Sequence, residues 1–210
     1  MAINADKPHL WKEDTETSVD FFNNWFMRFA PKAYRDTRID TTKEVKEALR
    51  VTNDLATITH EVLKSNPAIL PTLRMATCPP LARDRLSGLA HAGKSLVKAL
   101  EHGKLPARMP TAELDEQLRR LADIILRMLD TDIFPWLDKG RTPSSQGRHR
   151  ASTIVADRLC GSVSDPIIRN AQEKRQFACI ARYLNRRGYK RKAHPPSKPL
   201  KQMEPGTFSF

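Results

Sequence analysis

The sequence predicts a mainly α-helical protein with about seven helices. Apolar residues recur at three- and four-residue intervals along most of the chain, which places them on one side of a helix. Fifteen prolines among 210 residues indicate frequent breaks between the helices. The two-residue alternation of a strand occurs in Phe208-Ser209-Phe210, where nothing follows that could pair with it.

We expect an irregular arm over residues 1–13, followed by a helix that begins at Thr17 and stops before Pro31. The capping-box pattern Thr41-x-x-Glu44 indicates a second helix start. Prolines divide residues 65–86 into short helical pieces. The first helix has apolar residues at 3-4-3 spacing, namely Val19, Phe22, Phe26 and Phe29.

The clearest helix begins at Thr111, and Thr142-Pro143 then supplies an N-cap and a first-turn proline for a helix through residues 150–160. Ser164 is expected to cap the last helix, with Pro166 in its first turn and Gly188 as its end. The predicted division is a helical domain at 1–192 with a basic C-terminal helix, a Pro-rich linker at 193–206 and a strand start at 207–210. The helix from Thr111 carries an apolar stripe at 4-3-4-3 spacing: Leu114, Leu118, Leu121, Ile125 and Met128.

The charge balance favours a polyanionic partner. The chain carries 36 Lys and Arg against 24 Asp and Glu, a net charge of +12. Twelve basic and four acidic residues lie in residues 151–210, so that segment holds most of the excess. Nucleic acid is therefore expected before a membrane surface.

Cysteine usage predicts a reducing compartment, and hydropathy predicts no membrane span. Cys78, Cys160 and Cys179 form no C-x-x-C pair, so free thiols are expected. The first residues are polar, and no apolar run approaches the ~18 residues of a membrane span. We expect a cytoplasmic protein that contacts no membrane.

The helix over residues 165–187 carries the strongest functional pattern. At 100° per residue, Arg175, Arg182 and Arg186 fall together, almost opposite an apolar side that includes Phe177 and Leu184. The basic run continues through residues 186–192, with Tyr189 placed to stack on a base. A solvated face whose basic end complements the helix dipole is the alternative.

Four catalytic patterns fail on their context. Residues 88–95 match G-x-x-x-x-G-K-[ST], but no buried strand precedes them, so a turn between two helices is expected. Glu44-Val45-Lys46 is an E-x-K on a predicted helix, and residues 130–132 read as a turn at a helix end. Six scattered histidines show no metal-ligand spacing.

Several long stretches resemble the XamI-type restriction endonucleases, bacterial Type II enzymes that cut duplex DNA at a short specific site. The similarity extends from Ile3 to about Phe210. The stretches that carry it are INADKPHLW, FMRFAPKAYRDTR, PTLRMATCPPLARDRLSGLA, DTDIFPWL and VADRLCGSVSDPIIRNAQEKRQ.

The resemblance implies Mg²⁺-dependent hydrolysis of phosphodiester bonds by an α/β core of the PD-(D/E)XK type. That core is expected C-terminal to the helical part, so residues 207–210 resemble the start of a truncated nuclease core. The alternative is a short extended segment that docks onto the helical core. No residue of this sequence matches the catalytic aspartate, glutamate or lysine, and none is assigned. The resemblance further implies double-stranded DNA as substrate, a companion DNA methyltransferase and, for the complete enzyme, a homodimer.

The helical part would then position DNA. The alternative for its arginines is packing against the rest of the enzyme, or bracing the enzyme's acidic site. The expected phosphate contacts are Arg175, Arg182, Arg186, Arg187, Lys190, Arg191 and Lys192, with Arg148, Arg150, Arg158 and Arg169 as weaker candidates.

Two functions from different classes follow. The first is a Type II restriction endonuclease in a truncated form that does not cleave DNA by itself. The second is a non-catalytic helical module that binds nucleic acid. A P-loop phosphotransferase is a third and more remote hypothesis, which ATP binding would test.

Overall fold

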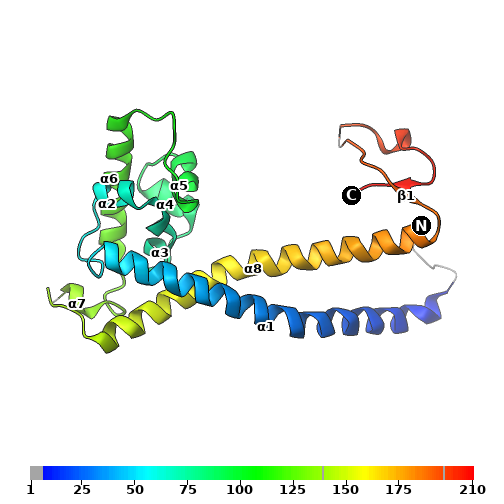
Figure 1. Cartoon of the computed structure of the whole chain (residues 1–210), viewed down its shortest axis with the longest axis horizontal. Helices are drawn as coiled ribbons and strands as arrows, with labels where there is room; N and C mark the ends of the chain where they lie inside the picture. Colours follow the sequence, from blue (N-terminus) through cyan, green and yellow to red (C-terminus); the bar gives the residue numbers. More distant parts are fainter. Residues whose placement is uncertain (1–6, 139, 196) are drawn as a thin grey trace. The chain divides into compact units, whose positions relative to one another are not determined.

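The computed structural model describes residues 7–138, 140–195 and 197–210 (Figure 1). These residues form eight α-helices and one short pair of strands, which confirms the mainly helical prediction. The helices are α1 Trp11–Val51, α2 His60–Ser65, α3 Leu70–Met75, α4 Arg83–Leu89, α5 Lys94–Glu101, α6 Thr111–Met128, α7 Pro135–Asp138 and α8 Ser145–Arg186. The strands are β1 Lys190–Arg191 and β2 Thr207–Phe208, and 3-10 turns lie at Pro8–Leu10, Pro67–Ile69 and Leu200–Gln202.

The chain divides into two compact units, which are described separately. The core unit is Pro31–Val163, and the terminal unit combines Met1–Ala30 with Ser164–Phe210. Helices α1 and α8 each contribute to both units, because the boundaries fall inside them. No helix in the described part of the chain is long and apolar enough to span a membrane.

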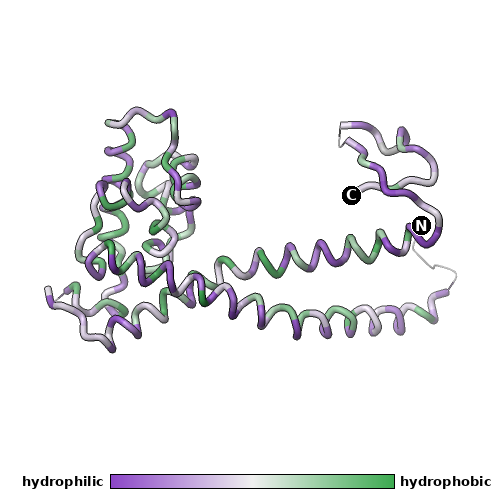
Figure 2. The backbone as a smooth tube through the Cα atoms, viewed as in Figure 1, coloured by the Kyte–Doolittle hydropathy of each residue, from purple (hydrophilic) through white to green (hydrophobic). Residues whose placement is uncertain are grey.

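The hydrophobic core lies almost entirely in the core unit, where α6 packs against α2 and α4 (Figure 2). The stripe predicted from Thr111 is confirmed, since Leu118, Leu121 and Ile125 are fully buried. Each buried leucine or isoleucine contributes about 1.5–3 kcal/mol relative to an exposed one. Phe134 and Trp136 close the core beyond α6, with their rings edge to face.

Three of the predicted helix boundaries near the N-terminus are wrong. Helix α1 continues through Pro31 and has no new start at Thr41, and it begins at Trp11 rather than at Thr17. A proline removes one backbone hydrogen bond, but stopping and nucleating a second helix costs more than continuing across that gap. The Thr41 hydroxyl lies 3.3 Å from the Arg38 carbonyl and 3.2 Å from the Ala156 carbonyl of α8, so it links two helices instead of capping one.

The same correction holds for α8, which is continuous from Ser145 to Arg186 and contains Pro166. Ser164 is buried inside this helix and does not start a new one. The cap at the start is Ser144, whose Oγ accepts a hydrogen bond from the Gly147 amide at 3.0 Å, and not Thr142.

The predicted end of α8 at Gly188 is confirmed. Gly188 adopts φ +86°, and its amide donates to the Asn185 carbonyl at 3.0 Å. The Tyr189 amide donates to the Leu184 carbonyl at 3.1 Å. This pair of bonds is the Schellman arrangement, which satisfies the last carbonyls of a helix and requires a left-handed residue.

The short helical pieces over residues 65–86 are also confirmed. Pro67 opens a 3-10 turn and Pro71 lies in the first turn of α3. Pro79 and Pro80 separate α3 from α4. Because proline lacks an amide proton but has a helical φ, it fits a first turn and interrupts anything longer.

Of the strand start predicted at residues 207–210, only Thr207–Phe208 is a strand, and it has a partner. Strand β2 pairs in parallel with β1, with Lys190 opposite Thr207 and Arg191 opposite Phe208. The segment between the strands contains a 3-10 turn and returns the chain to the end of α8. The division of the sequence at residues 192 and 206 remains a prediction.

Candidate nucleic-acid interface

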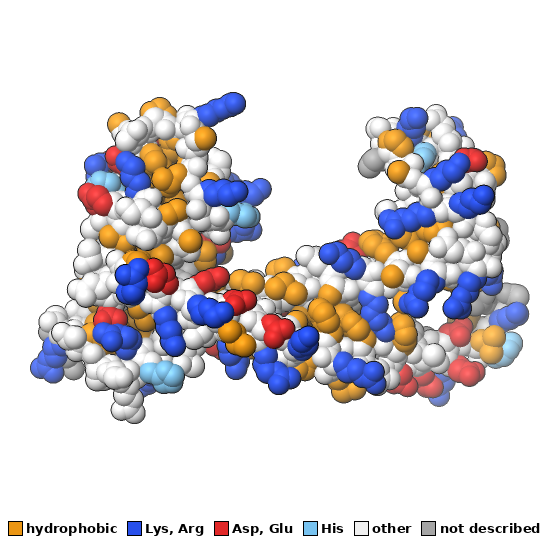
Figure 3. Space-filling model, viewed as in Figure 1, with side chains coloured by type: hydrophobic (Ala, Val, Ile, Leu, Met, Phe, Trp, Pro, Cys, Tyr) orange, Lys and Arg blue, Asp and Glu red, His pale blue; other side chains and the backbone are white. Residues whose placement is uncertain are grey.

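The strongest concentration of predicted phosphate-binding residues lies where α8 ends and β1 begins (Figure 3). All of its members are solvent-exposed. The helix ends in the Schellman turn, so the chain reverses there and places helical and strand cations near one another. We call this set the C-terminal basic surface: Arg182, Arg186, Arg187, Lys190, Arg191 and Lys192.

The strand pair is held to α8 by aromatic stacking. The Phe210 ring lies 4.8 Å from the Phe177 ring at an interplanar angle of 11°, and Phe208 is buried beside them. The Arg191 guanidinium lies 5.0 Å from the centre of the Phe210 ring. These contacts hold Arg191 in position at a modest cost in free energy, because a guanidinium over an aromatic face needs no buried counterion.

One carboxylate interrupts the positive charge. Lys192 Nζ forms an ion pair with the Glu204 carboxylate, and both side chains are more than half exposed. The hydrogen bond from Lys192 lowers the pKa of Glu204, so this carboxylate is charged at neutral pH. Lys192 is therefore partly neutralised, whereas Lys190 forms no ion pair among the described residues.

The remaining cations of the surface have different surroundings. Arg187 lies 4.4 Å from the Tyr183 ring centre, and Arg182 bonds the Ala178 carbonyl and the Cys179 sulfur, each at 3.3 Å. Arg186 has no ion pair or hydrogen bond from its side chain to any described residue, and Arg169, nearer the middle of α8, is likewise exposed. Arg186 and Lys190 are thus the two cations of the C-terminal basic surface whose side chains have no ion-pair, hydrogen-bond or aromatic partner among the described residues.

Arg175 does not belong to that surface. Its guanidinium lies 3.7 Å from the Phe21 ring centre and 5.5 Å from that of Trp25, and it bonds the Phe21 carbonyl at 3.2 Å. Arg175 therefore contacts α1 within the terminal unit, although Arg182 and Arg186, on the same side of α8, are exposed. The sequence predicted a phosphate contact for Arg175, whereas in the structure its guanidinium lies against aromatic rings of α1.

The three weaker candidates in the core unit also differ from one another. Arg150 is exposed, without a side-chain partner among the described residues. Arg158 bonds the Met75 and Thr77 carbonyls and the buried Asp130 carboxylate at 3.1 Å, so its guanidinium joins α8 to the ends of α3 and α6. Arg148 forms a two-point ion pair with Asp54, with Nε–Oδ1 at 2.7 Å and Nη2–Oδ2 at 2.5 Å.

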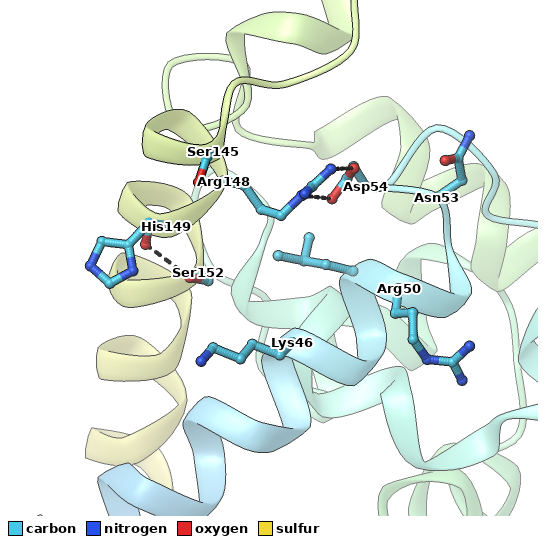
Figure 4. Close-up of a pocket in the computed structure, with 9 residues that line it drawn as sticks. Lys46, Arg50, Asn53, Asp54, Ser145, Arg148, His149 and Ser152 are labelled. Atoms are coloured by element: carbon cyan, nitrogen blue, oxygen red, sulfur yellow. Dashed lines mark hydrogen bonds and ion pairs between the residues drawn. The ribbon is translucent and has the colours of Figure 1, made fainter.

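A basic pocket of about 470 Å³ beside Arg148 was not predicted from the sequence (Figure 4). One turn after another of α1 and of α8 contributes a residue to it, at three- and four-residue spacing. The spacing within each segment can be read from the sequence. The sequence does not show that these two segments, a hundred residues apart, face each other. Its lining is Lys46, Leu49, Arg50, Asn53, Asp54, Ser145, Arg148, His149 and Ser152.

The catalytic patterns that failed on sequence context fail on geometry as well. Residues 88–95 join α4 to α5 with no strand before them, and the Gly93 amide donates to the Gln117 side chain at 2.8 Å. Glu44 and Lys46 lie on α1 two positions apart, about 200° around the helix, so they face opposite directions. Asp130 accepts from the Ile133 amide and pairs with Arg158, as a structural turn does.

The described residues do not fit the metal that the family resemblance implies. Among them, no group of three or more His, Cys, Asp or Glu side chains converges closely enough to hold an ion. A magnesium site needs clustered carboxylate oxygens, usually with substrate phosphate. No chemical step is therefore assigned to a metal on these residues.

Comparison with known proteins agrees with the similarity seen in the sequence. The family model for the XamI restriction endonuclease matches residues 53–210. The Type II restriction enzyme SalI of Streptomyces albus G is 52% identical over 208 residues, which cover 99% of this chain and 66% of the SalI enzyme. No solved structure shows a significant match. With a family model matching about three quarters of its length and a relative this similar, the chain belongs to the XamI restriction endonuclease family.

Proposed function

We propose that these 210 residues bind duplex DNA through the C-terminal basic surface and hold it for site-specific cleavage in a Type II restriction endonuclease. The similarity to SalI supports the substrate, since that relative is a Type II restriction enzyme. The observation that carries the proposal is the surface itself: six exposed cations around one turn of chain, with one nearby carboxylate at Glu204.

Phosphate binding is the chemistry that this surface suits. Arginine and lysine on flexible exposed stems replace the counterions condensed on DNA, and that release drives binding without reading sequence. Tyr183 and Tyr189 are 53% and 43% exposed among these cations and offer apolar faces to sugars or bases. The surface thus sets the register of the duplex, while base-edge contacts would supply specificity.

Cleavage is proposed to need sequence beyond these residues. The SalI enzyme has a further third of its length that the match does not include, and the PD-(D/E)XK chemistry of the resemblance has no counterpart among the described residues. The Mg²⁺ that the family resemblance implies would supply the hydrolytic chemistry, and no residue described here is assigned to hold it. The 210 residues by themselves bind and orient DNA without cutting it.

We further propose a partner, an oligomeric state and a cellular compartment for the enzyme. A restriction endonuclease acts beside a DNA methyltransferase that protects the host's own sites, and a palindromic site favours a homodimer. Such a system works in the cytoplasm. These statements rest on the family membership of the chain.

The direct test uses the purified chain with plasmid DNA and a labelled duplex, with and without magnesium. We expect retardation of the duplex at low salt and no double-strand cut in either condition. Cutting at one fixed sequence would contradict the division of labour, and a duplex that is not retarded even at low salt would contradict DNA binding by this surface.

A further inference from the structure

The pocket between the C-terminal part of α1 and the first turns of α8 lies wholly within the core unit. Its lining contains three basic side chains, Lys46, Arg50 and Arg148, against one carboxylate, Asp54. Arg50 pairs with Glu47, at 2.6 Å between Nη2 and Oε1, and turns away from α8 (Figure 4). Arg148 in turn pairs with Asp54, so the unpaired charge left for a ligand is that of Lys46, and Arg148 offers its remaining N–H donors.

Of Lys46 and Arg148, Lys46 is the one whose charge is not already paired. Its side chain is exposed, forms no ion pair with a described residue, and extends from α1 toward α8 (Figure 4). An ammonium group in this position is a point charge with three donors, which suits a phosphate oxygen. The neighbouring His149 and Ser145 add side chains that can donate a proton.

Arg148 is held in a fixed orientation. Two of its nitrogens bind the Asp54 carboxylate, and Asp54 is anchored in turn because its carbonyl accepts the Trp136 indole proton at 2.9 Å. Asn53, Asp54 and Leu55 all have φ between 49° and 68°, so this corner of the chain is a left-handed turn, closed by the bond from the Asp54 amide to the Leu49 carbonyl. The guanidinium keeps donors free on the side away from Asp54, while its side chain is 48% exposed.

We propose that this pocket binds a phosphate group, with Lys46 as the contacting cation and Arg148, oriented by Asp54, as the second donor. The inference deepens the proposed DNA binding and rests on it for the source of the phosphate, a diester of the DNA backbone. It places a phosphate contact in the core unit, apart from the residues of the C-terminal basic surface. Free inorganic phosphate shares the same chemistry and is the other source to be distinguished.

The test compares two single-charge variants, Lys46→Ala and Lys98→Ala. Lys98 is also an exposed helical lysine without an ion pair among the described residues, but it lies on α5, outside the pocket. Binding of a labelled duplex is measured by fluorescence anisotropy over a range of salt concentrations. Loss of one phosphate contact lowers the slope of log K against log salt by about 0.9, which weakens binding about eightfold at 0.1 M relative to 1 M.

We expect that loss for Lys46→Ala and an unchanged slope for Lys98→Ala. Equal behaviour of the two variants, in a chain that does bind DNA, would overturn the contact between the pocket and the DNA backbone while leaving the proposed function intact. Absence of DNA binding by the unsubstituted chain would instead remove the proposed function.

A second measurement identifies the source of the phosphate. The melting temperature is recorded in inorganic phosphate and in chloride at equal ionic strength, for the unsubstituted chain and for Lys46→Ala. Stabilisation by phosphate that Lys46→Ala abolishes supports the pocket and shows that it accepts the free ion. No such stabilisation, together with the altered DNA slope, supports the backbone diester; a negative result in both measurements overturns the inference.

Discussion

Arg74 and Glu101 form a buried ion pair between α3 and α5. Two nearly parallel bonds join them, Nε–Oε1 at 2.7 Å and Nη2–Oε2 at 2.9 Å, and the side chains are 8% and 12% exposed. The third nitrogen of Arg74 donates to the Leu81 carbonyl, so the guanidinium also holds the proline-rich turn after α3. The pair thus fixes three elements of the core unit at one point.

Removing one partner of this pair should cost more stability than removing both. Glu101→Ala leaves a buried guanidinium without its counterion, which costs about 3–5 kcal/mol of unfolding free energy. Arg74→Met combined with Glu101→Leu removes both charges and retains apolar volume, so we expect a smaller loss. Denaturant unfolding measures both. A double variant less stable than Glu101→Ala would show that the bond to Leu81, rather than the ion pair, dominates.

Glu44 makes the stability of the chain depend on pH. Desolvation, followed by the neighbouring charge of Asp40, raises the pKa of Glu44. The folded chain therefore holds this proton more tightly than the unfolded chain, and ionising Glu44 destabilises the fold as the pH rises from the ordinary carboxyl range through the raised value. Below the ordinary pKa of the unfolded carboxyl the cost is absent.

Glu44→Gln should accordingly melt at a higher temperature than the unsubstituted chain at neutral pH. The difference should close as the pH falls below the carboxyl range. Glu173→Gln, which removes an exposed carboxylate on α8, is the matched control and should show no such trend. A difference that widens in acid would mean that the sign of the effect is reversed.

Glu204 restrains the charge of Lys192, so removing it should strengthen DNA binding. In Glu204→Gln the ammonium of Lys192 is released from its ion pair, which is solvent-exposed and therefore weak. We expect affinity for a duplex to rise by up to about fivefold. Glu116→Gln changes the net charge equally but frees Arg119 and Arg120 on α6. An equal gain from both variants would attribute the effect to net charge alone.

Two glycines of the α8 region should respond to alanine with opposite signs. A methyl group at Gly161, inside the helix, meets nothing within 4 Å, so Gly161→Ala should stabilise by about 0.5–1 kcal/mol through helix propensity. Gly188 has φ +86°, so Gly188→Ala should destabilise by about 1 kcal/mol or more. Thermal melting followed by circular dichroism decides. Stabilisation by Gly188→Ala would show that the Schellman turn does not form.

Local signals predicted the parts of the fold that local physics decides. The stripe from Thr111 gave α6, the prolines of residues 65–86 gave short pieces, and Gly188 gave the end of α8. Pro31 and Pro166 misled because continuation of a helix past one missing hydrogen bond depends on the flanking turns and not on the proline itself.

The site divides in the same manner. The basic run at residues 186–192 was visible as composition and is exposed in the structure. Arg175 lies against Phe21, and Lys46 lines a pocket with Arg148, because residues of α1 face residues of α8 within each unit. The periodicity of a segment shows which of its residues share a side. It does not show which segment, more than a hundred residues away, that side contacts, so the sequence could not reveal these pairings.

The central claim is that the C-terminal basic surface binds DNA through phosphates. The most direct test is the salt dependence of duplex binding by the unsubstituted chain and by two quadruple variants. One variant replaces Arg186, Arg187, Lys190 and Arg191 by alanine, and the control replaces Arg83, Arg85, Lys98 and Lys104, four exposed cations of the core unit. The six cations of the C-terminal basic surface should contribute about −5.4 to the slope of log K against log salt. The first variant should lose about 3.6 of that slope and the control none; a flat response of the unsubstituted chain, or equal losses in both variants, would contradict the claim.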